Sequence, residues 1–269
     1  MQTSASSLKT PLLFCLTVFL ISAVLWLAEP LAAGAMPDLP VHLPPSSLMA
    51  FFPLVTACLF AGGRNRGEGI RRLFGRLADL RFLRNGKRWL LPALFLMPLV
   101  LCASWLILVL ADAPLPEPDL HWPMVPVFFA VFLLAAAGEE AGWMLYVVDP
   151  LQRRWNALTA GLVCGAVWAL WHLVPYMRDG HDAGWIVWHS LVTVLLRIAI
   201  VWLYNNTGRS VPMAVLLHAS ANVGFFLFPD YGSHYDPMTT ALVLAAAVAV
   251  LVRVRGFRTL AGFRHKPGA

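Results

Sequence analysis

The chain has 269 residues, of which 59% are hydrophobic and only 13% are charged, and its net charge is +6. Soluble domains carry about 25% charged residues, so this composition excludes an ordinary soluble domain and is typical of a polytopic membrane protein. We therefore expect an all-α bundle that forms one integral membrane domain over residues 1–269. The positive charge bears first on orientation in the bilayer, and we expect no nucleic-acid partner.

Eight apolar segments are candidates to cross the bilayer, whose core of about 30 Å needs about 20 residues per helix. They cover residues 11–29, 47–62, 89–111, 123–148, 157–174, 185–204, 210–228 and 238–252. The second and the last are short. The first resembles a signal peptide, but its apolar run from Pro11 to Ala28 exceeds the usual length of about 7–15 residues, which favours a retained helix. The four cysteines lie one to an apolar block without a CxxC pair, which argues against a disulfide framework or a zinc knuckle.

The stretch Gly69–Arg84 differs from these spans because it is amphipathic. Ile70, Leu73, Leu77 and their neighbours recur at helical spacing, and arginines fill the other face. This pattern predicts one helix lying on the cytoplasmic leaflet, where it anchors the adjoining spans or, alternatively, recruits substrate.

Basic residues gather in the loops that eight spans place on one side of the bilayer. They lie at Lys9, within 64–88, at Arg153 and Arg154, and within 253–266, whereas acidic residues such as Asp38, Asp119 and Asp230 lie in the alternate loops. The positive-inside rule then predicts that both termini are cytoplasmic. In a bacterium the protein would lie in the plasma membrane.

Several polar side chains interrupt the apolar segments. They are Glu139, Glu140, His172, His189, Arg197, His218 and Asn222. An ionised side chain at the centre of the bilayer costs about 2.5–3.5 kcal/mol on insertion scales, and such residues usually mark a site inside the bundle. We give His189 a structural role, because it lies near the end of its segment.

The spacing of these residues suggests a chemical site. His218 and Asn222 are four residues apart and share a helix face, as do Trp168 and His172. Glutamate with histidine can activate water, and histidine with asparagine can stabilise an oxyanion. Glu139, His172 and His218 are also residue types that bind zinc, but the HExxH motif is absent, so a metal-free mechanism is equally open.

Three motifs on successive helices resemble those of the CPBP membrane proteases, which comprise CAAX-type prenyl endopeptidases and bacteriocin-processing (Abi) relatives. The motif EExxxR corresponds to residues 139–144, FxxxH to 168–172 and HxxxN to 218–222. The resemblance covers about 123–228, the expected catalytic core. It departs from the family twice, since Trp168 replaces Phe and Met144 replaces Arg.

The resemblance implies an eight-helix membrane endopeptidase. Glu139 and His172 would activate water, His218 and Asn222 would stabilise the oxyanion, and Glu140 would support them. The substrate would be a membrane-associated peptide; a prenylated CAAX tail, a bacteriocin precursor and other peptides stay open, as does the oligomeric state.

The missing arginine at position 144 suggests a hypothesis about Arg197. Counted from the cytoplasmic helix ends, Arg197 lies ~12 Å and Glu140 ~14 Å deep. Arg197 can therefore supply the charge that Met144 lacks. The alternative is an arginine that extends along its helix to the membrane interface.

Two further matters stay open at this point. The same count places His172 at ~22 Å, so helix 157–174 must begin outside the membrane or be tilted for His172 to meet Glu139. The other function classes are a non-catalytic immunity or scaffold protein, favoured by the loss of the motif arginine, and a proton-coupled transporter. A transporter more often shows inverted repeats and broken helices, which we do not find.

Overall fold

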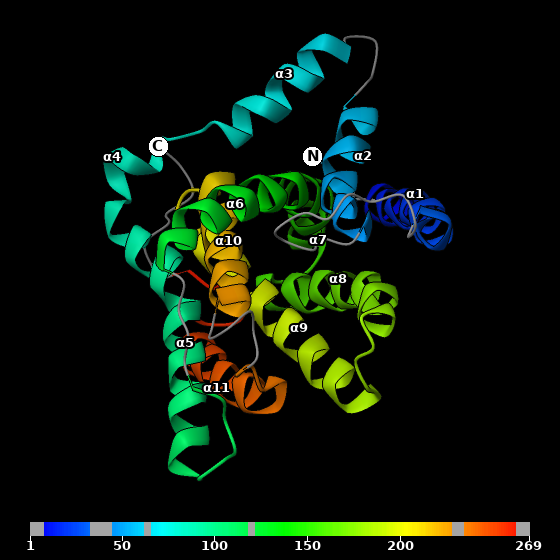
Figure 1. The fold of residues 1–269 in the computed structure, drawn as a ribbon. Coiled ribbons are helices and arrows are strands. Elements are labelled where there is room, and N and C mark those ends of the chain that lie inside the picture. Colours follow the sequence, from blue (N-terminus) through cyan, green and yellow to red (C-terminus); the bar gives the residue numbers. More distant parts are fainter. Residues whose placement is uncertain (1–7, 33–44, 62–65, 118–121, 228–233, 262–269) are drawn as a thin grey trace.

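The computed structural model describes residues 8–32, 45–61, 66–117, 122–227 and 234–261, and all regular elements within these ranges are helices. Within the described residues, six helices are long and apolar enough to cross a membrane, which confirms the predicted polytopic all-α bundle (Figure 1). Some charged residues used for the orientation lie outside the described ranges: Asp38, Arg64, Asp119, Asp230, Arg264 and Lys266. The single domain over 1–269 stays a prediction.

The helices follow the eight predicted segments closely. The long ones are α1 (Lys9–Ala32), α5 (Leu90–Leu110), α6 (Val125–Gly142), α8 (Ala157–Arg178), α9 (Ala183–Asn206) and α11 (Pro237–Arg255). Two apolar helices are shorter, namely η1 (Pro45–Phe51) with α2 (Phe52–Phe60), and α10 (Val211–Leu227). The second predicted segment is short, as expected. The last segment is not short, because α11 is long enough to cross a membrane, and the other short helix is α10, the seventh segment.

The predicted amphipathic helix Gly69–Arg84 is interrupted. The structure has α3 (Arg66–Leu77), a turn, α4 (Phe82–Asn85) and the short η2 (Lys87–Trp89), at one edge of the bundle (Figure 1). In the turn, the Asp79 carboxylate accepts a hydrogen bond from the backbone N–H of Arg81 at 3.1 Å and from its guanidinium at 2.6 Å. A short acidic side chain that bonds to nearby backbone competes with the helix, which explains the break.

The helix that carries the two glutamates is longer than predicted. After α6 it continues through a π-helical segment, η4 (Trp143–Val148), into α7 (Asp149–Arg154). Glu140 therefore lies fourteen residues before Arg154, or ~21 Å along the helix, and His172 lies fifteen residues into α8, or ~22 Å. The predicted depths of Glu140 and His172 differed because the predicted segment of Glu140 ended at residue 148. With the helix continued to Arg154, the two depths agree.

Glycines permit close packing around this helix. A Cβ atom on Gly165 of α8 would lie 2.9 Å from Val194 Cα and 3.1 Å from Arg197 Cβ, both on α9. On α6, a Cβ on Gly138 would lie 2.7 Å from the carbonyl oxygen of Ala50. Small residues let membrane helices approach closely. Here Gly165 brings α8 close to α9, and Gly138 brings α6 close to η1.

Candidate active site

Glu139 lies on α6 with its carboxylate held from one side. Its Oε2 atom accepts hydrogen bonds from Trp168 Nε1 at 2.6 Å and from Trp143 Nε1 at 3.4 Å. Among the hydrogen bonds of the described residues, none reaches Oε1. The side chain is only 5% exposed. One oxygen is thus fixed by indole donors, while the other can accept a proton.

Glu140 points to a different neighbour, as expected for residues that are ~100° apart on a helix. Its Oε2 atom lies 2.5 Å from Arg197 Nη1, and its Oε1 atom lies 2.8 Å from His218 Nδ1. Glu140 and Arg197 are fully buried, and His218 is 2% exposed. A buried carboxylate is stable only when it is paired and hydrogen-bonded, and both oxygens here meet that condition.

The predicted contact of Arg197 with the glutamates is therefore confirmed, and the alternative that it reaches the membrane interface is wrong. Arg197 Nη1 also lies 3.8 Å from the Sδ atom of Met144, the residue that replaces the motif arginine. A guanidinium from α9 thus lies beside Met144 of η4, the position where the motif has its arginine. Any effect on catalysis stays a prediction.

Trp168 touches most of the site. Besides donating to Glu139, its ring lies 4.1 Å from the guanidinium carbon of Arg197 and packs edge-on against His218, with centroids 4.9 Å apart. A cation over an indole face is attracted by the ring quadrupole. The tryptophan that replaces the family's phenylalanine therefore adds a hydrogen-bond donor and keeps the aromatic surface.

The two histidines present their Nδ1 atoms to acceptors. His172 Nδ1 lies 2.9 Å from the carbonyl oxygen of Trp168, and His218 Nδ1 bonds to Glu140. A carbonyl or an ionised carboxylate can only accept, so Nδ1 carries the proton in each ring. In the neutral rings, Nε2 of each is then left with a lone pair. Among the hydrogen bonds of the described residues, neither histidine is bonded to Glu139.

The remaining predicted residues lie at the margin of this cluster. Asn222 is partly exposed, one turn after His218 on α10. His189 donates to or accepts from the hydroxyl of Tyr235 at 2.7 Å and stacks on Trp185. His189 belongs to an aromatic group, in keeping with the structural role given to it.

The zinc alternative stays a prediction, because Glu139 Oε1 and the Nε2 atoms of His172 and His218 have no hydrogen bond among the described residues. Within the described ranges, no three or more His, Cys, Asp or Glu side chains are grouped so that they could hold a metal. Glu139 Oε2 is taken by two indoles, and Glu140 by Arg197 and His218. We therefore derive no step through a metal.

Trp143 is the residue of this site that the sequence analysis missed. It is fully buried on the π-helical segment and donates to Glu139 from four residues away. That i, i+4 spacing was the available signal, but an apolar membrane segment contains many aromatic residues.

The near-complete burial of Glu139, Glu140 and His218 also means that a substrate reaches them only after neighbouring side chains move.

Comparison with known proteins agrees with the motifs. The family model described as Rce1-like, type II CAAX prenyl endopeptidase, matches residues 121–224. CAAX prenyl protease 2 of Methanococcus maripaludis is 26% identical over 264 residues, which cover 90% of this chain and 93% of that protein. The resemblance inferred from the three motifs is confirmed.

Proposed function

Because the chain is similar to CAAX-type membrane endopeptidases, we propose that it hydrolyses a peptide bond of a membrane-associated peptide with Glu139 as the general base. The observation that carries this proposal is the carboxylate of Glu139, held at Oε2 by the Trp168 indole at 2.6 Å. A fixed, nearly dry carboxylate with a free oxygen suits a base whose orientation must not change during the reaction.

The proposed reaction uses this chain's own groups. Glu139 accepts a proton from a water molecule while the water oxygen attacks the scissile carbonyl carbon. The carbonyl oxygen becomes the oxyanion of a tetrahedral intermediate. Glu139 then returns the proton to the leaving amine as the C–N bond breaks. The water atoms end on the new carboxyl and amine termini, so the steps balance without a cofactor.

His172, His218 and Asn222 take supporting roles in this proposal. The lone pair on Nε2 of His172 can accept a hydrogen bond from the attacking water and orient it. The Asn222 amide can donate a hydrogen bond to the oxyanion whatever the protonation state of the two histidines, because an amide does not titrate. His218 can donate through Nε2 only when its ring carries a second proton, because Nδ1 already faces Glu140.

The substrate and the orientation are further parts of the proposal. The name of the archaeal relative, a CAAX prenyl protease, supports including prenylated peptides among the candidates. The basic residues at the ends of α7 and α11 support cytoplasmic termini, so the scissile bond would be approached from the cytoplasmic side.

The test is cleavage of a mixed library of prenylated and plain peptides by the purified protein, read by mass spectrometry. We expect Glu139→Gln to lower the rate at least ~100-fold, as for loss of a general base. Glu117→Gln is the matched control, because Glu117 is an exposed loop glutamate. A chelator arm tests metal dependence. Cleavage by Glu139→Gln at the wild-type rate would refute the proposal, and a folded but inactive wild type would favour the immunity or scaffold protein.

A further inference from the structure

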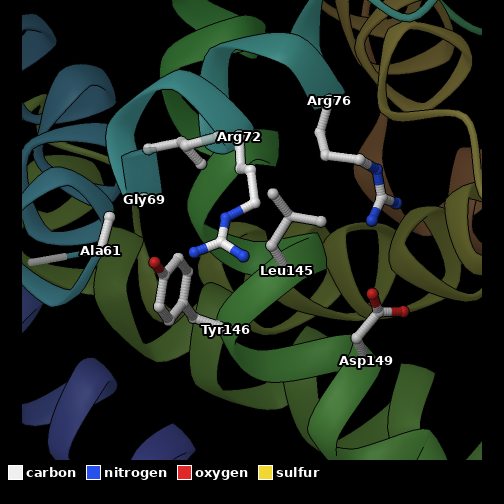
Figure 2. A pocket seen from close by; sticks show the side chains of 8 residues that line it. Ala61, Gly69, Arg72, Arg76, Leu145, Tyr146 and Asp149 are labelled. Carbon is white, nitrogen blue, oxygen red and sulfur yellow. The ribbon is translucent and has the colours of Figure 1, made fainter. Parts of the chain in front are cut away.

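A cavity of about 360 Å³ lies beneath α3, away from the glutamates (Figure 2). Its wall is formed by α3, the end of α2 and the helix that carries the site. The lining residues are Ala61, Gly69, Arg72, Leu73, Arg76, Leu145, Tyr146 and Asp149. Figure 2 shows Arg72 and Arg76 reaching from α3 toward the helix that bears Leu145, Tyr146 and Asp149. The cavity thus combines two guanidinium groups with apolar side chains.

The two arginines differ in how far they are already engaged. Arg76 Nη2 donates to the hydroxyl of Tyr204 at 2.8 Å and to the carbonyl oxygen of Arg209 at 2.9 Å, which fixes its position. Arg72 makes only a loose ion pair with Glu68, at 3.8 Å, and 72% of its side chain is exposed. Arg72 therefore keeps most of its donors for a ligand.

The acidic residues near the cavity each lie beside an arginine, although Asp149 Oδ1 has no hydrogen-bond partner. Asp149 accepts a hydrogen bond from Tyr204 at 3.2 Å and lies 3.5 Å from Arg209 Nη1. A second hollow of about 540 Å³ shares Arg72 and Arg76 and adds Arg81, whose guanidinium lies 2.6 Å from Asp79. That hydrogen bond holds the pKa of Asp79 below its usual range. The cavity therefore has an excess of positive charge.

The cavity lies at the end of the bundle where basic residues gather. The contacts of Arg76 reach residues beside the C-terminus of α9 and the N-terminus of α10, and Arg153 and Arg154 end α7 nearby. Helix ends of a membrane bundle lie at the level of the lipid headgroups. Basic pockets between membrane helices at this level bind anionic headgroups.

We propose that this cavity binds the phosphate of an anionic phospholipid through Arg72, with Arg76 as a fixed second charge. Guanidinium groups bind phosphate oxygens through paired, charge-assisted hydrogen bonds. Leu73 and Leu145 offer apolar surface to the glycerol and the first acyl carbons. Leu145 and Tyr146 belong to the π-helical segment whose Trp143 bonds to Glu139, so the lipid rests against the segment that holds the site.

Native mass spectrometry of the purified protein in mixed micelles tests this proposal. The micelles contain phosphatidylglycerol and phosphatidylcholine in equal amounts, and the variants are Arg72→Gln and Arg71→Gln. Arg71 is also exposed on α3 but does not line the cavity. We expect wild type and Arg71→Gln to retain phosphatidylglycerol selectively. Arg72→Gln should bind it about tenfold less well, as for loss of a charge-assisted hydrogen bond.

Three outcomes would overturn the proposal. Equal retention by wild type and Arg72→Gln would mean that the cavity does not bind the headgroup. An equal loss in Arg71→Gln would indicate general surface attraction only. Displacement of the lipid by millimolar inorganic phosphate, or an Arg72-dependent rise in melting temperature with phosphate alone, would assign the site to the free anion. Since no arm measures cleavage, failure here is distinct from failure of the proposed peptidase activity.

Discussion

Two regions of this molecule pair arginine with carboxylates in opposite surroundings. Inside the bundle, Arg197 and Glu140 lie 2.5 Å apart and neither is exposed at all. At the α3 edge, the pair of Arg81 and Asp79 lies 2.6 Å apart, but the arginine is 73% exposed. The contact distances are nearly the same, so geometry alone does not distinguish the two pairs.

The two ion pairs differ in whether water can solvate the remaining charge when one partner is removed. At the edge, water and salt solvate the remaining charge, so an exposed pair contributes little to stability. In the interior, the remaining charge has no such replacement. The interior pair therefore acts as a structural requirement, while the edge is free to bind something else. Two pairs of substitutions test this contrast, and a third pair compares two hydrogen-bond donors inside the site.

The largest expected effect is from Arg197→Leu, which leaves the Glu140 charge buried without its partner. Breaking a buried ion pair by removing one member costs about 3–5 kcal/mol. We expect a correspondingly large fall in the melting temperature of the purified protein in detergent. Arg81→Leu, which removes the partner of Asp79 at the edge, should leave the melting temperature nearly unchanged.

Two double variants check the cause of that loss. Glu140→Gln added to Arg197→Leu removes the uncompensated charge and should recover part of the stability. Met144→Arg added to Arg197→Leu places a guanidinium at the motif position and should recover both stability and cleavage. If Arg197→Leu alone melts as the wild type does, the interior pair is not the requirement that we infer.

An intermediate effect is expected from adding a methyl group between helices. Gly165→Ala places a Cβ atom 2.9 Å from Val194 Cα, so α8 and α9 must separate, at a cost of about 1–3 kcal/mol. Gly75→Ala on α3 meets nothing within 4 Å and should be neutral or stabilising by up to ~1 kcal/mol. Thermal unfolding should therefore show a loss of stability for Gly165→Ala and no loss for Gly75→Ala. Equal shifts for both variants would contradict the difference in packing.

The smallest effect is expected from Trp168→Phe, which removes one hydrogen-bond donor and keeps the ring that faces Arg197. A hydrogen bond to a charged group contributes about 1.5 kcal/mol or more, so we expect kcat to fall about tenfold or more. Trp143→Phe removes the longer contact of 3.4 Å and should lower kcat less. The reverse order would mean that Trp168 does not hold Glu139.

The sequence predicted the fold well because membrane spans are long apolar segments that composition alone reveals. It failed at two local positions. The break after Leu77 depends on one side-chain contact, from Asp79 to Arg81. The helix also continues past Val148, the last residue of the π-helical segment, into α7 (Asp149–Arg154).

The sequence predicted which residues belong to the candidate site better than it predicted the contacts between them. The pairing of Arg197 with Glu140 followed from helix depth and a missing motif arginine. The link between Glu139 and Trp168 could not be predicted, because it depends on the rotation of α8 against α6 and on close packing at Gly165. Periodicity gives the face of a helix, but not which of two neighbours on that face makes the contact.

The π-helical segment has a consequence for sequence alignment and engineering. An α-helix rotates ~100° per residue, so one residue more or less between Glu139 and Asp149 would turn the two ends out of phase. At one end Glu139 faces Trp168, and at the other Asp149 faces Tyr204. A wide turn accommodates an extra residue and lets both ends keep their partners. A relative without this turn would need a one-residue gap here, and deleting one residue from 143–148 would force the chain to give up one set of partners.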